Sequence, residues 1–512
     1  MRTRLAFLAL VVAVALAGGR TTSSHGATAP KLVPQAVMAP ETPAVRADGV
    51  TPACTAPSAD PSGTVKTYAW IHCYTAQQIR AAYGVDAVGS KGDGQTIVLV
   101  DSYGSPTAAQ DLQHFHDVFF PSEPNPNFDQ VYPNGSPDYN NVGNGQSGSS
   151  GAAGWSGEAT LDIEWAYAIA PHAHLVLLAV PPAETEGVQG FPNLFKAMQW
   201  AIDNYPAGTV FSQSFGVTEQ TFGGAASGQT ARFDRVYQAA AAKGDTILAS
   251  SGDSGSMNVS KQQRDSRTYP YPVDGWPASS PWVTAVGGTQ LQYGWTWAPT
   301  SDVPFTAAGD YNPGYWNYTA GGDTEVVWNE SWLPAATGGG PSAIYPRPSW
   351  QNSVAGIIGA DARGVPDLSW NAAVNGGVLV WITAFPQVQR AGWHVYGGTS
   401  ASSPQIAGLI ALANQQQAAA GQPPLGHVAP LLYKVGNNAS AFRDIQATTQ
   451  GTAASGVLDS NQMWDYNGDG AAVSLDPVQG WPVLAGWDMT TGFGSPKAAG
   501  FVTAIRAARN TP

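Results

Sequence analysis

Gln95-Thr96-Ile97-Val98-Leu99-Val100-Asp101 is the stretch that indicates the fold most directly. An unbroken apolar run closed by an acidic residue is typical of a strand buried on both faces, and a helix is predicted behind it over Thr107–Phe120. The same alternation continues downstream, with strands predicted at His174–Val180, Thr209–Ser214, Thr246–Ser250 and Val283–Val286, and helices at Asn193–Asp203 and Ala231–Lys243. Alternating strands and helices predict an α/β fold, a doubly wound and mainly parallel sheet with helices on both faces.

A sheet of this kind binds ligands at the carboxyl ends of its strands. One region, Gly288–Gly340, is dense in Trp, Tyr, Gly and Asn and breaks the alternation. We interpret it as long surface insertions rather than as a second domain.

The composition describes a large folded protein with sparse charge. Of 512 residues only 12% are charged and 43% are hydrophobic, and the net charge is −13. The 18 Trp, 19 Tyr and 16 Phe supply ample core material, which excludes global disorder. Because the chain is acidic and has no basic block, nucleic acid and anionic membranes are excluded as main partners.

The first 65 residues are predicted to precede the folded part. Arg2 and Arg4 lead into an apolar run, Leu5–Ala17, that is short for a membrane span and ends in a small-x-small cleavage pattern. Residues 1–17 are therefore predicted to be a signal peptide, which makes the protein secreted, extracellular and free of the membrane after cleavage; a membrane anchor is the alternative. Residues 18–65 are interpreted as a linker or a short propeptide remnant, and residues 66–512 as one domain. Cys54 and Cys73 are predicted to form one disulfide.

The candidate nucleophile is Ser400, in the string Gly-Gly-Thr-Ser-Ala-Ser-Ser-Pro-Gln-Ile-Ala-Gly over residues 397–408. A tight glycine turn delivers this serine just before an apolar helix, whose first turn is expected to hold Pro404. Backbone amides at the start of that helix would help to bind an oxyanion. An ordinary Ser/Thr-rich helix cap is the alternative interpretation.

A carboxylate is the candidate base for this serine. None of the eight histidines stands in the H-G-T setting that a histidine base would have. Glu158 and Asp162 lie four positions apart in a largely apolar helical stretch, so they share one face, and buried paired carboxylates are typical of acid–base work. The string Gly252-Asp253-Ser254-Gly255-Ser256 imitates a trypsin-like nucleophile motif, but the α/β pattern contradicts a double β-barrel.

These motifs resemble the sedolisins, serine-carboxyl peptidases with a subtilisin-like fold, from about Tyr74 to the C-terminus. The resemblance rests on E-x-x-L-D at 158–162, G-T-S-x-x-x-P at 398–404 and S-S-G-D-S-G at 250–255. It implies that Glu158 is the general base for Ser400, that Asp162 hydrogen-bonds Glu158 and that Asp253 completes the oxyanion hole. It also implies a substrate-binding segment, which contains Ser212, Ser214, Phe215 and Gly216.

The resemblance further implies calcium near the C-terminus. The expected ligands of one Ca²⁺ are the carboxylates of Asp444 and Asp488 and the carbonyls of Ile445, Leu484 and Gly486, a set that suits a hard cation. A loop with EF-hand-like spacing is a hypothesis for a second Ca²⁺, a plain Asx/Gly turn being the alternative; its ligands would be Asp465, Asn467, Asp469 and Asp476.

Together these observations predict a secreted, monomeric, acid-active endopeptidase that cuts protein or peptide substrates through an acyl-enzyme on Ser400. Asp253 can donate a hydrogen bond to an oxyanion only when protonated, and a carboxylate base suits the same low pH. The alternatives are a subtilisin-type protease with Asp101, a histidine and Ser400, and a catalytically inactive secreted binding homologue. Sedolisins usually carry a long folded propeptide, for which residues 18–65 are short.

Overall fold

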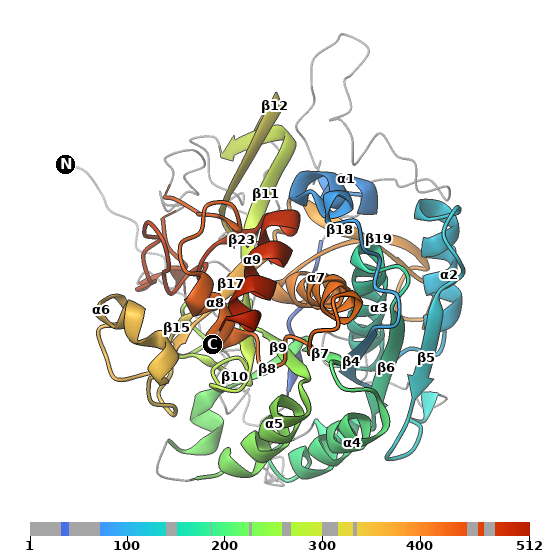
Figure 1. Ribbon diagram of the computed structural model, residues 1–512. Helices are drawn as coiled ribbons and strands as arrows, with labels where there is room; N and C mark the ends of the chain where they lie inside the picture. Colours follow the sequence, from blue (N-terminus) through green and yellow to red (C-terminus); the bar gives the residue numbers. More distant parts are fainter. Residues whose placement is uncertain are drawn as a thin grey trace, which may run out of the picture.

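The fold is built around one large twisted sheet (Figure 1). In the computed structural model the described residues are 32–39, 72–139, 151–185, 187–224, 228–258, 268–299, 316–330, 335–447, 459–464 and 477–511. The eight-stranded sheet has the order β12-β11-β9-β7-β4-β6-β5, and β17 pairs with β11. Its strands are β4 (Thr96–Ser102), β5 (Asn127–Val131), β6 (His174–Val180), β7 (Val210–Gln213), β9 (Thr246–Ser250), β11 (Thr284–Pro299), β12 (Trp316–Val327) and β17 (Leu368–Asn371).

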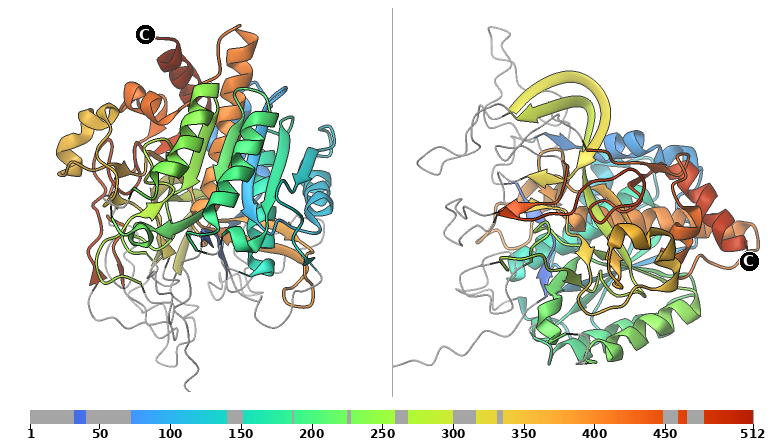
Figure 2. Two further views of the ribbon diagram at one scale, coloured as in Figure 1. Left: turned by 90° about the horizontal axis from the view of Figure 1, so that it is seen from below. Right: turned by 90° about the vertical axis from the view of Figure 1, so that its left-hand side faces the viewer.

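Every pairing in this sheet is parallel except β11 with β12. Helices cover both faces: α3 (Ala152–Ile169) and α7 (Thr399–Ala419) pack together on one face, and α4 (Phe191–Asn204) and α5 (Ala231–Lys243) lie on the other (Figure 2). Helix α2 (Ala108–Phe119) packs beside α3. The predicted doubly wound α/β class is confirmed.

Helices α3 and α7 are buried along almost their whole length because they lie between the sheet and further layers of chain. A helix that is covered all round is apolar all round, and this explains why neither sequence shows a polar stripe. Both helices also bury polar residues on several sides, among them Glu158, Asp162 and Ser400. Buried polar groups on otherwise apolar helices mark the site described below.

The chain changes direction in the sheet at β4. Strand β4 lies between β6 and β7. After β4 the chain forms the edge strand β5 and then β6 on one side of β4, and it crosses to the other side to form β7, β9 and β11. In a doubly wound sheet such a switch point opens a crevice at the carboxyl ends of the strands. Asp101, Ser214 and Asp253 lie at the end of β4 or just after β7 and β9, so they face this crevice.

Two smaller sheets flank the carboxyl edge of the large one. A four-stranded sheet has the order β2-β19-β18-β3, and a three-stranded sheet the order β1-β8-β10. Their strands are β1 (Val33–Pro34), β2 (Val37–Met38), β3 (Cys73–Tyr74), β8 (Phe215–Thr218), β10 (Gly275–Trp276), β18 (Gly377–Ile382) and β19 (Gly392–Gly397). The two sheets matter because strands from the N-terminal segment, β1 and β2, complete both of them.

The other elements are short and peripheral. The helices are α1 (Ala76–Tyr83), α6 (Ala355–Ile358), α8 (Ala429–Val435) and α9 (Ala498–Asn510), with 3-10 turns at Val85–Val88, Pro182–Glu184, Glu219–Phe222 and Ser349–Val354. The strands are β13 (Asn329–Glu330), β14 (Ala335–Ala336), β15 (Gly340–Pro341), β16 (Gly364–Val365), β20 (Phe442–Arg443), β21 (Met463–Trp464), β22 (Pro477–Val478) and β23 (Ser495–Pro496).

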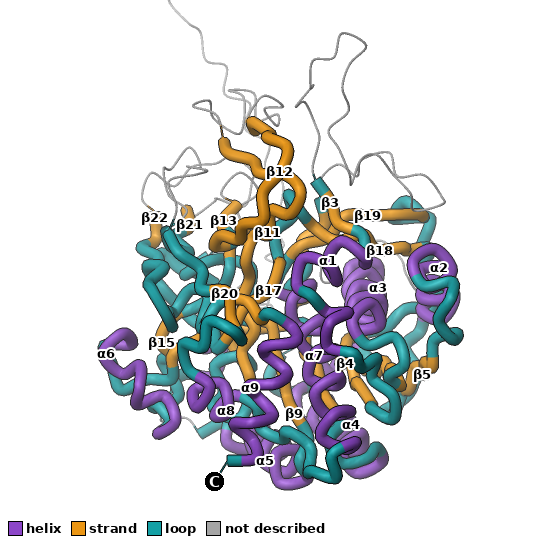
Figure 3. Tube along the Cα trace, turned by 45° about the horizontal axis from the view of Figure 1, so that its top comes forward, coloured by secondary structure: helices purple, strands orange, loops and turns teal. Residues whose placement is uncertain are grey.

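The predicted insertion at Gly288–Gly340 is mainly an antiparallel hairpin of β11 and β12, which rises from the body of the molecule (Figure 3). Its base continues the central sheet, and its register shifts between Tyr293 and Trp295. The described part of the insertion is thus an extension of the sheet edge.

The predicted strands and helices lie where the sequence placed them, to within two residues at their ends, except that the strand predicted at Val283–Val286 continues as β11 to Pro299. The expected place of Pro404 is wrong: α7 begins at Thr399, so Ser400 is already in the first turn and Pro404 stands inside the helix. A proline there has no N–H for the Ser400 carbonyl four residues earlier. Within the described ranges no helix is long and apolar enough to cross a membrane.

Candidate active site

The two candidate carboxylates share one buried face of α3. Glu158 and Asp162 are one helical turn apart, and both side chains are fully buried. The Asp162 Oδ1 atom accepts a hydrogen bond of 2.8 Å from the hydroxyl of Ser214, which follows β7. Helix α3 therefore presents its carboxylates to the carboxyl edge of the sheet.

Ser400 reaches the same place from α7. The turn before it needs glycine, because Gly398 has φ +96° and a Cβ there would overlap the backbone of residues 35 and 36. The Ser400 Oγ donates to the Ser214 carbonyl at 3.2 Å, and the Ser400 N–H donates to the Gln35 carbonyl at 2.9 Å. The serine is fully buried beneath this contact.

The base and the nucleophile are adjacent. Burial raises the pKa of Glu158 well above its usual value, the charges of Asp162 and Asp101 raise it further, and the Ser400 hydroxyl opposes the shift by hydrogen-bonding the anion. Among the residues that the structure describes, neither Glu158 oxygen has a partner in good hydrogen-bond geometry. The carboxyl group is thus held close to the serine with nothing else to satisfy it.

Asp101 is a further member of this cluster. It stands at the carboxyl end of β4, is fully buried, and has no hydrogen-bond partner in the described ranges. Burial raises its pKa to about 8, and its charge raises the pKa of both Glu158 and Asp162. The sequence offered Asp101 only as the acid of a histidine-based triad, and its partners here are carboxyl groups.

The histidine-based alternative loses support. The seven histidines in the described part of the chain make their contacts elsewhere: His72 with Tyr74, His114 with Trp381, His116 with Tyr167, His172 with Asp93 and Glu123, His174 with Asp129, His394 with the Arg390 carbonyl, and His427 with Trp282. None of these contacts involves Ser400.

Asp253 faces the nucleophile from the loop after β9. Its Oδ1 accepts hydrogen bonds from the Thr399 N–H at 2.7 Å and from the Thr399 hydroxyl at 2.9 Å. Its Oδ2 is buried without a partner among the described residues and lies 2.7 Å from the point where a Cβ of Gly398 would stand, a point that the Gln35 carbonyl oxygen also borders. Burial raises the pKa of Asp253 to about 7. An oxyanion hole requires a hydrogen-bond donor beside a peptide carbonyl, and a protonated Oδ2 at this position could supply one.

The four candidate substrate-binding residues fall into two groups. Phe215 and Gly216 pair as strand β8 with another extended segment, and Ser214 donates its hydroxyl to Asp162 while its carbonyl accepts from the backbone. Ser212 lies inside β7, and its hydroxyl pairs with that of Ser403 at 2.8 Å. Ser212 therefore joins the sheet to α7 and does not face the crevice.

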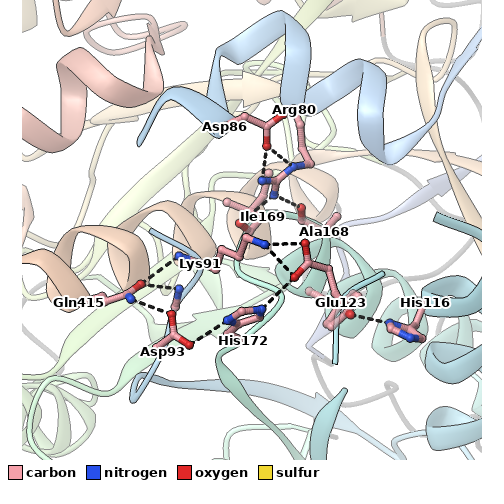
Figure 4. Close-up of polar contacts among 12 residues, drawn as sticks. Arg80, Asp86, Lys91, Asp93, His116, Glu123, Ala168, Ile169, His172 and Gln415 are labelled. Carbon is pink, nitrogen blue, oxygen red and sulfur yellow. Dashed lines mark hydrogen bonds and ion pairs between the residues drawn. The ribbon is translucent and has the colours of Figure 1, made fainter. Parts of the chain in front are cut away.

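The end of α3 is fixed by Arg80 (Figure 4). This buried guanidinium donates to the carbonyls of Ala168 at 2.7 Å and Ile169 at 3.1 Å, which the helix leaves without partners. It is itself paired with Asp86. The arginine thus sets the position of the helix that carries the carboxylates.

The loop after α3 is held by a surface network in the same view (Figure 4). His172 lies between Asp93 at 2.8 Å and Glu123 at 2.9 Å, and Lys91 donates to Glu123 at 2.6 Å. Lys91 lowers the pKa of Glu123, and His172 lowers it further. This network is structural, since it lies at the opposite end of α3 from Glu158.

The predicted calcium residues lie in two neighbouring loops, residues 444–445 and residues 484–488. The Leu484 N–H donates to Asp488 Oδ2 at 2.9 Å, and the Gly486 N–H donates to Asp444 Oδ1 at 3.0 Å. Both carboxylates thus border the loop that also carries the Leu484 and Gly486 carbonyls, and Ile445 is adjacent in sequence to Asp444. An oxygen-only set of this kind fits Ca²⁺. Within the described ranges no group of three or more His, Cys, Asp or Glu side chains gathers in a metal site.

Some predictions fall outside the described residues. These are the signal peptide at 1–17, Cys54 of the predicted disulfide, and the second calcium loop with Asp465, Asn467, Asp469 and Asp476. They stay predictions.

Comparison with known proteins places this geometry in a family. The profile of the subtilase family (Peptidase_S8) matches residues 92–464. Kumamolisin from Bacillus sp. is 32% identical over 348 residues, which is 67% of this chain and 50% of that protein, and sedolisin from Pseudomonas sp. is 34% identical over 245 residues, 46% of this chain and 34% of that protein. The chain belongs to the sedolisin family. The family recognition made from the sequence is confirmed.

Structure agrees with this assignment. Pseudomonas sedolisin, a serine-carboxyl proteinase solved with pseudo-iodotyrostatin, superposes with a TM-score of 0.59 at 26% identity, covering 85% of this sedolisin-family chain and 99% of that one. The subtilisin-like fold is thereby confirmed. Tripeptidyl-peptidase 1 from Macaca fascicularis is more distant, at 28% identity over 66% of this chain and 50% of that protein. The chain spans about half the length of kumamolisin and of tripeptidyl-peptidase 1.

Proposed function

We propose that this protein is an acid-active serine-carboxyl endopeptidase. Ser400 is the nucleophile, Glu158 the general base, and Asp162 with Asp101 the carboxyl groups that orient and tune Glu158. One observation carries the proposal: Ser400, Glu158 and Asp253 converge from three separate elements on a peptide carbonyl, that of Gln35, which the Ser400 N–H already holds.

The reaction follows from the positions of these groups. Ser400 Oγ attacks the substrate carbonyl carbon and gives its proton to Glu158. The oxyanion that forms accepts hydrogen bonds from the Ser400 N–H and from protonated Asp253. The C–N bond then breaks, and the departing amine takes the proton from Glu158. Water, deprotonated by the same carboxylate, hydrolyses the acyl-enzyme and restores Ser400.

The acidic working range follows from the protons that this scheme needs. Asp253 must keep its proton to donate, and burial holds its pKa at about 7, so activity is expected to fall above that pH. Glu158 must lose its proton, and because burial and neighbouring carboxyls raise its pKa, the acid limb is expected above 4.5. Because these carboxyl groups interact, the apparent pKa values of the pH–activity profile describe the cluster as a whole and not one residue. The expected profile has its maximum at mildly acidic pH.

Ca²⁺ is proposed as a structural ion, since the loops of Asp444 and Asp488 lie among the C-terminal elements. It would be held by these carboxylates and by the carbonyls of Ile445, Leu484 and Gly486, and it would tie together the two loops that carry them. No catalytic step requires it.

Denatured proteins or peptides are the proposed substrates, and a secreted monomer is the proposed form, secretion being supported by the leader-like residues 1–17.

The test is proteolysis of denatured casein between pH 3 and 8 by the wild type and by Ser400→Ala and Glu158→Gln. Both variants are expected to lose at least about 10³-fold in turnover, because nucleophile and base act as a unit. Ser403→Ala is the control: this serine lies on the same helix, and its hydroxyl bonds Ser212 instead of the cluster. A folded wild type that never cleaves casein would favour the inactive binding homologue, and a maximum at neutral pH would refute the carboxylate mechanism.

A further inference from the structure

The N-terminal segment Leu32–Ala39 lies across the active site as an extended strand. Val33 and Pro34 form β1, which pairs antiparallel with β8 so that Val33 faces Gly216 and Pro34 faces Phe215. The Gln35 N–H donates to the Ser214 carbonyl at 3.1 Å. Upstream of Gln35 the segment therefore occupies the edge where a peptide substrate would add a strand.

Downstream of Gln35 the same segment continues along a second edge. Val37 and Met38 form β2, which pairs antiparallel with β19 at Gly397 and Tyr396, and the Ala39 N–H donates to the Val395 carbonyl at 2.9 Å. The segment thus bridges two sheets on opposite sides of Ser400. Both flanks of the Gln35–Ala36 peptide bond are held by backbone pairing.

The reacting groups are centred on this one bond. The Gln35 carbonyl accepts from the Ser400 N–H at 2.9 Å, and both the Gln35 oxygen and the Ala36 Cα border the Gly398 turn beside Asp253 Oδ2. Gln35 is buried, whereas Met38 is 46% exposed. The Gln35 side-chain carbonyl accepts from the Asp253 N–H at 3.1 Å, so the glutamine side chain also has a binding site.

We propose that the enzyme cuts its own chain between Gln35 and Ala36. The segment Leu32–Ala39 is then a built-in substrate that covers the site until it is cleaved. This inference rests on the proposed function and adds the bond that is cut and the specificity: glutamine before the cut, with proline preceding it, and alanine after.

The chemistry balances without any added reagent except water. Ser400 Oγ bonds to the Gln35 carbonyl carbon, and its proton passes to Glu158. The bond between the Gln35 carbon and the Ala36 nitrogen breaks, and that nitrogen takes the proton and becomes the new N-terminus. Water then releases the peptide that ends at Gln35 and returns the hydrogen to Ser400. The upstream product is then no longer joined to β2, and it is held by the β8 pairing and by the hydrogen bonds of Leu32 and Gln35 alone.

The experiment compares intact masses and N-terminal sequences of the purified full chain after incubation at pH 5. The wild type is expected to acquire the N-terminus Ala-Val-Met-Ala-Pro of residues 36–40, and Ser400→Ala is expected to retain the uncut segment. Ala36→Pro should block the cut at this bond while leaving Ser400 intact, and Ala36→Ser is the matched control that should still be cut. A rate unchanged over a tenfold range of protein concentration would identify cleavage within one molecule.

Casein hydrolysis in the same samples separates the two proposals. If casein is degraded but residue 36 never becomes an N-terminus, or if Ser400→Ala is cut at the same bond, self-cleavage is refuted and the peptidase proposal stands. If neither casein nor the segment is cut, both fail.

The specificity is tested with the synthetic peptide Lys-Leu-Val-Pro-Gln-Ala-Val-Met-Ala-Pro, the sequence of residues 31–40. Processed wild type should cleave it at Gln-Ala at least tenfold faster than the same peptide with glutamate for glutamine, and equal rates would refute the specificity.

Discussion

The proton on Asp253 is expected to set the alkaline limit of activity. In the structure one oxygen, Oδ1, is fixed by the Thr399 N–H and hydroxyl. The other, Oδ2, has no partner among the described residues and borders the Gly398 turn, as does the Gln35 carbonyl that Ser400 holds. Because burial raises the pKa of Asp253 to about 7, Oδ2 is a donor below that pH and a repelling anion above it. Asp253→Asn places an amide there that donates at every pH, and Asp253→Ala removes the donor.

The magnitude follows from these two facts. Loss of one oxyanion donor costs roughly 2.7–4 kcal/mol, about 10²–10³ in turnover. Asp253→Ala should show this loss throughout the range where the wild type is active. The wild type should lose about tenfold in activity for each pH unit above 7, as the protonated fraction falls. Asp253→Asn should keep measurable activity and move the alkaline limb upward by at least about one pH unit.

The assay is kcat/KM for a fluorogenic peptide from pH 3 to 9. Asp245→Asn is the matched control, because Asp245 is also buried, with its pKa raised by burial to about 6, but it binds the backbone of Gly208 and Thr209. That variant should leave the alkaline limb unchanged. Wild-type activity in Asp253→Ala at all pH values, or an unmoved alkaline limb in Asp253→Asn, would refute the oxyanion assignment.

Three further outcomes are expected. Burial raises the folded pKa of Asp101 to about 8, so its contribution to stability is present below pH 4 and is lost as pH rises toward 8. In a Ser400→Ala background the Tm should therefore fall over that pH range, and Asp101→Asn should make the fall less steep. An unchanged slope of Tm against pH would contradict this. Arg80→Met should lower the free energy of unfolding, measured in urea, by about 1.5–3 kcal/mol, because the C-terminal carbonyls of α3 lose their hydrogen-bond donor. The control Lys91→Met, which removes a more exposed ion pair, should lower it by less than about 1 kcal/mol, and equal losses in the two variants would argue against the cap. Removal of Ca²⁺ by EDTA should lower the Tm reversibly. Asp488→Asn should abolish this response to EDTA, and the exposed control Asp361→Asn should preserve it. A wild-type Tm that EDTA does not change would refute the proposed Ca²⁺ site.

Local sequence was sufficient where one residue pattern has one physical solution. The apolar run at Gln95–Asp101 had to be a buried strand, and the spacing of Glu158 and Asp162 had to bring both carboxylates to one helix face. The turn before Ser400 likewise needs glycine, because a side chain at Gly398 would overlap the backbone of residues 35 and 36. These features depend on the spacing of residues along the sequence and on the position of glycine, and both can be seen in one sequence.

The tertiary structure decided which of these groups meet. Asp101 looks like any acidic residue that ends a strand, and only the sheet order places it against Glu158 and Asp162. The segment Leu32–Ala39 has no periodicity, because its strands are two residues long and exist through pairing with β8 and β19. Short strands are fixed by partners that lie hundreds of residues away, and the order in which distant segments close on one another is not written in any local pattern.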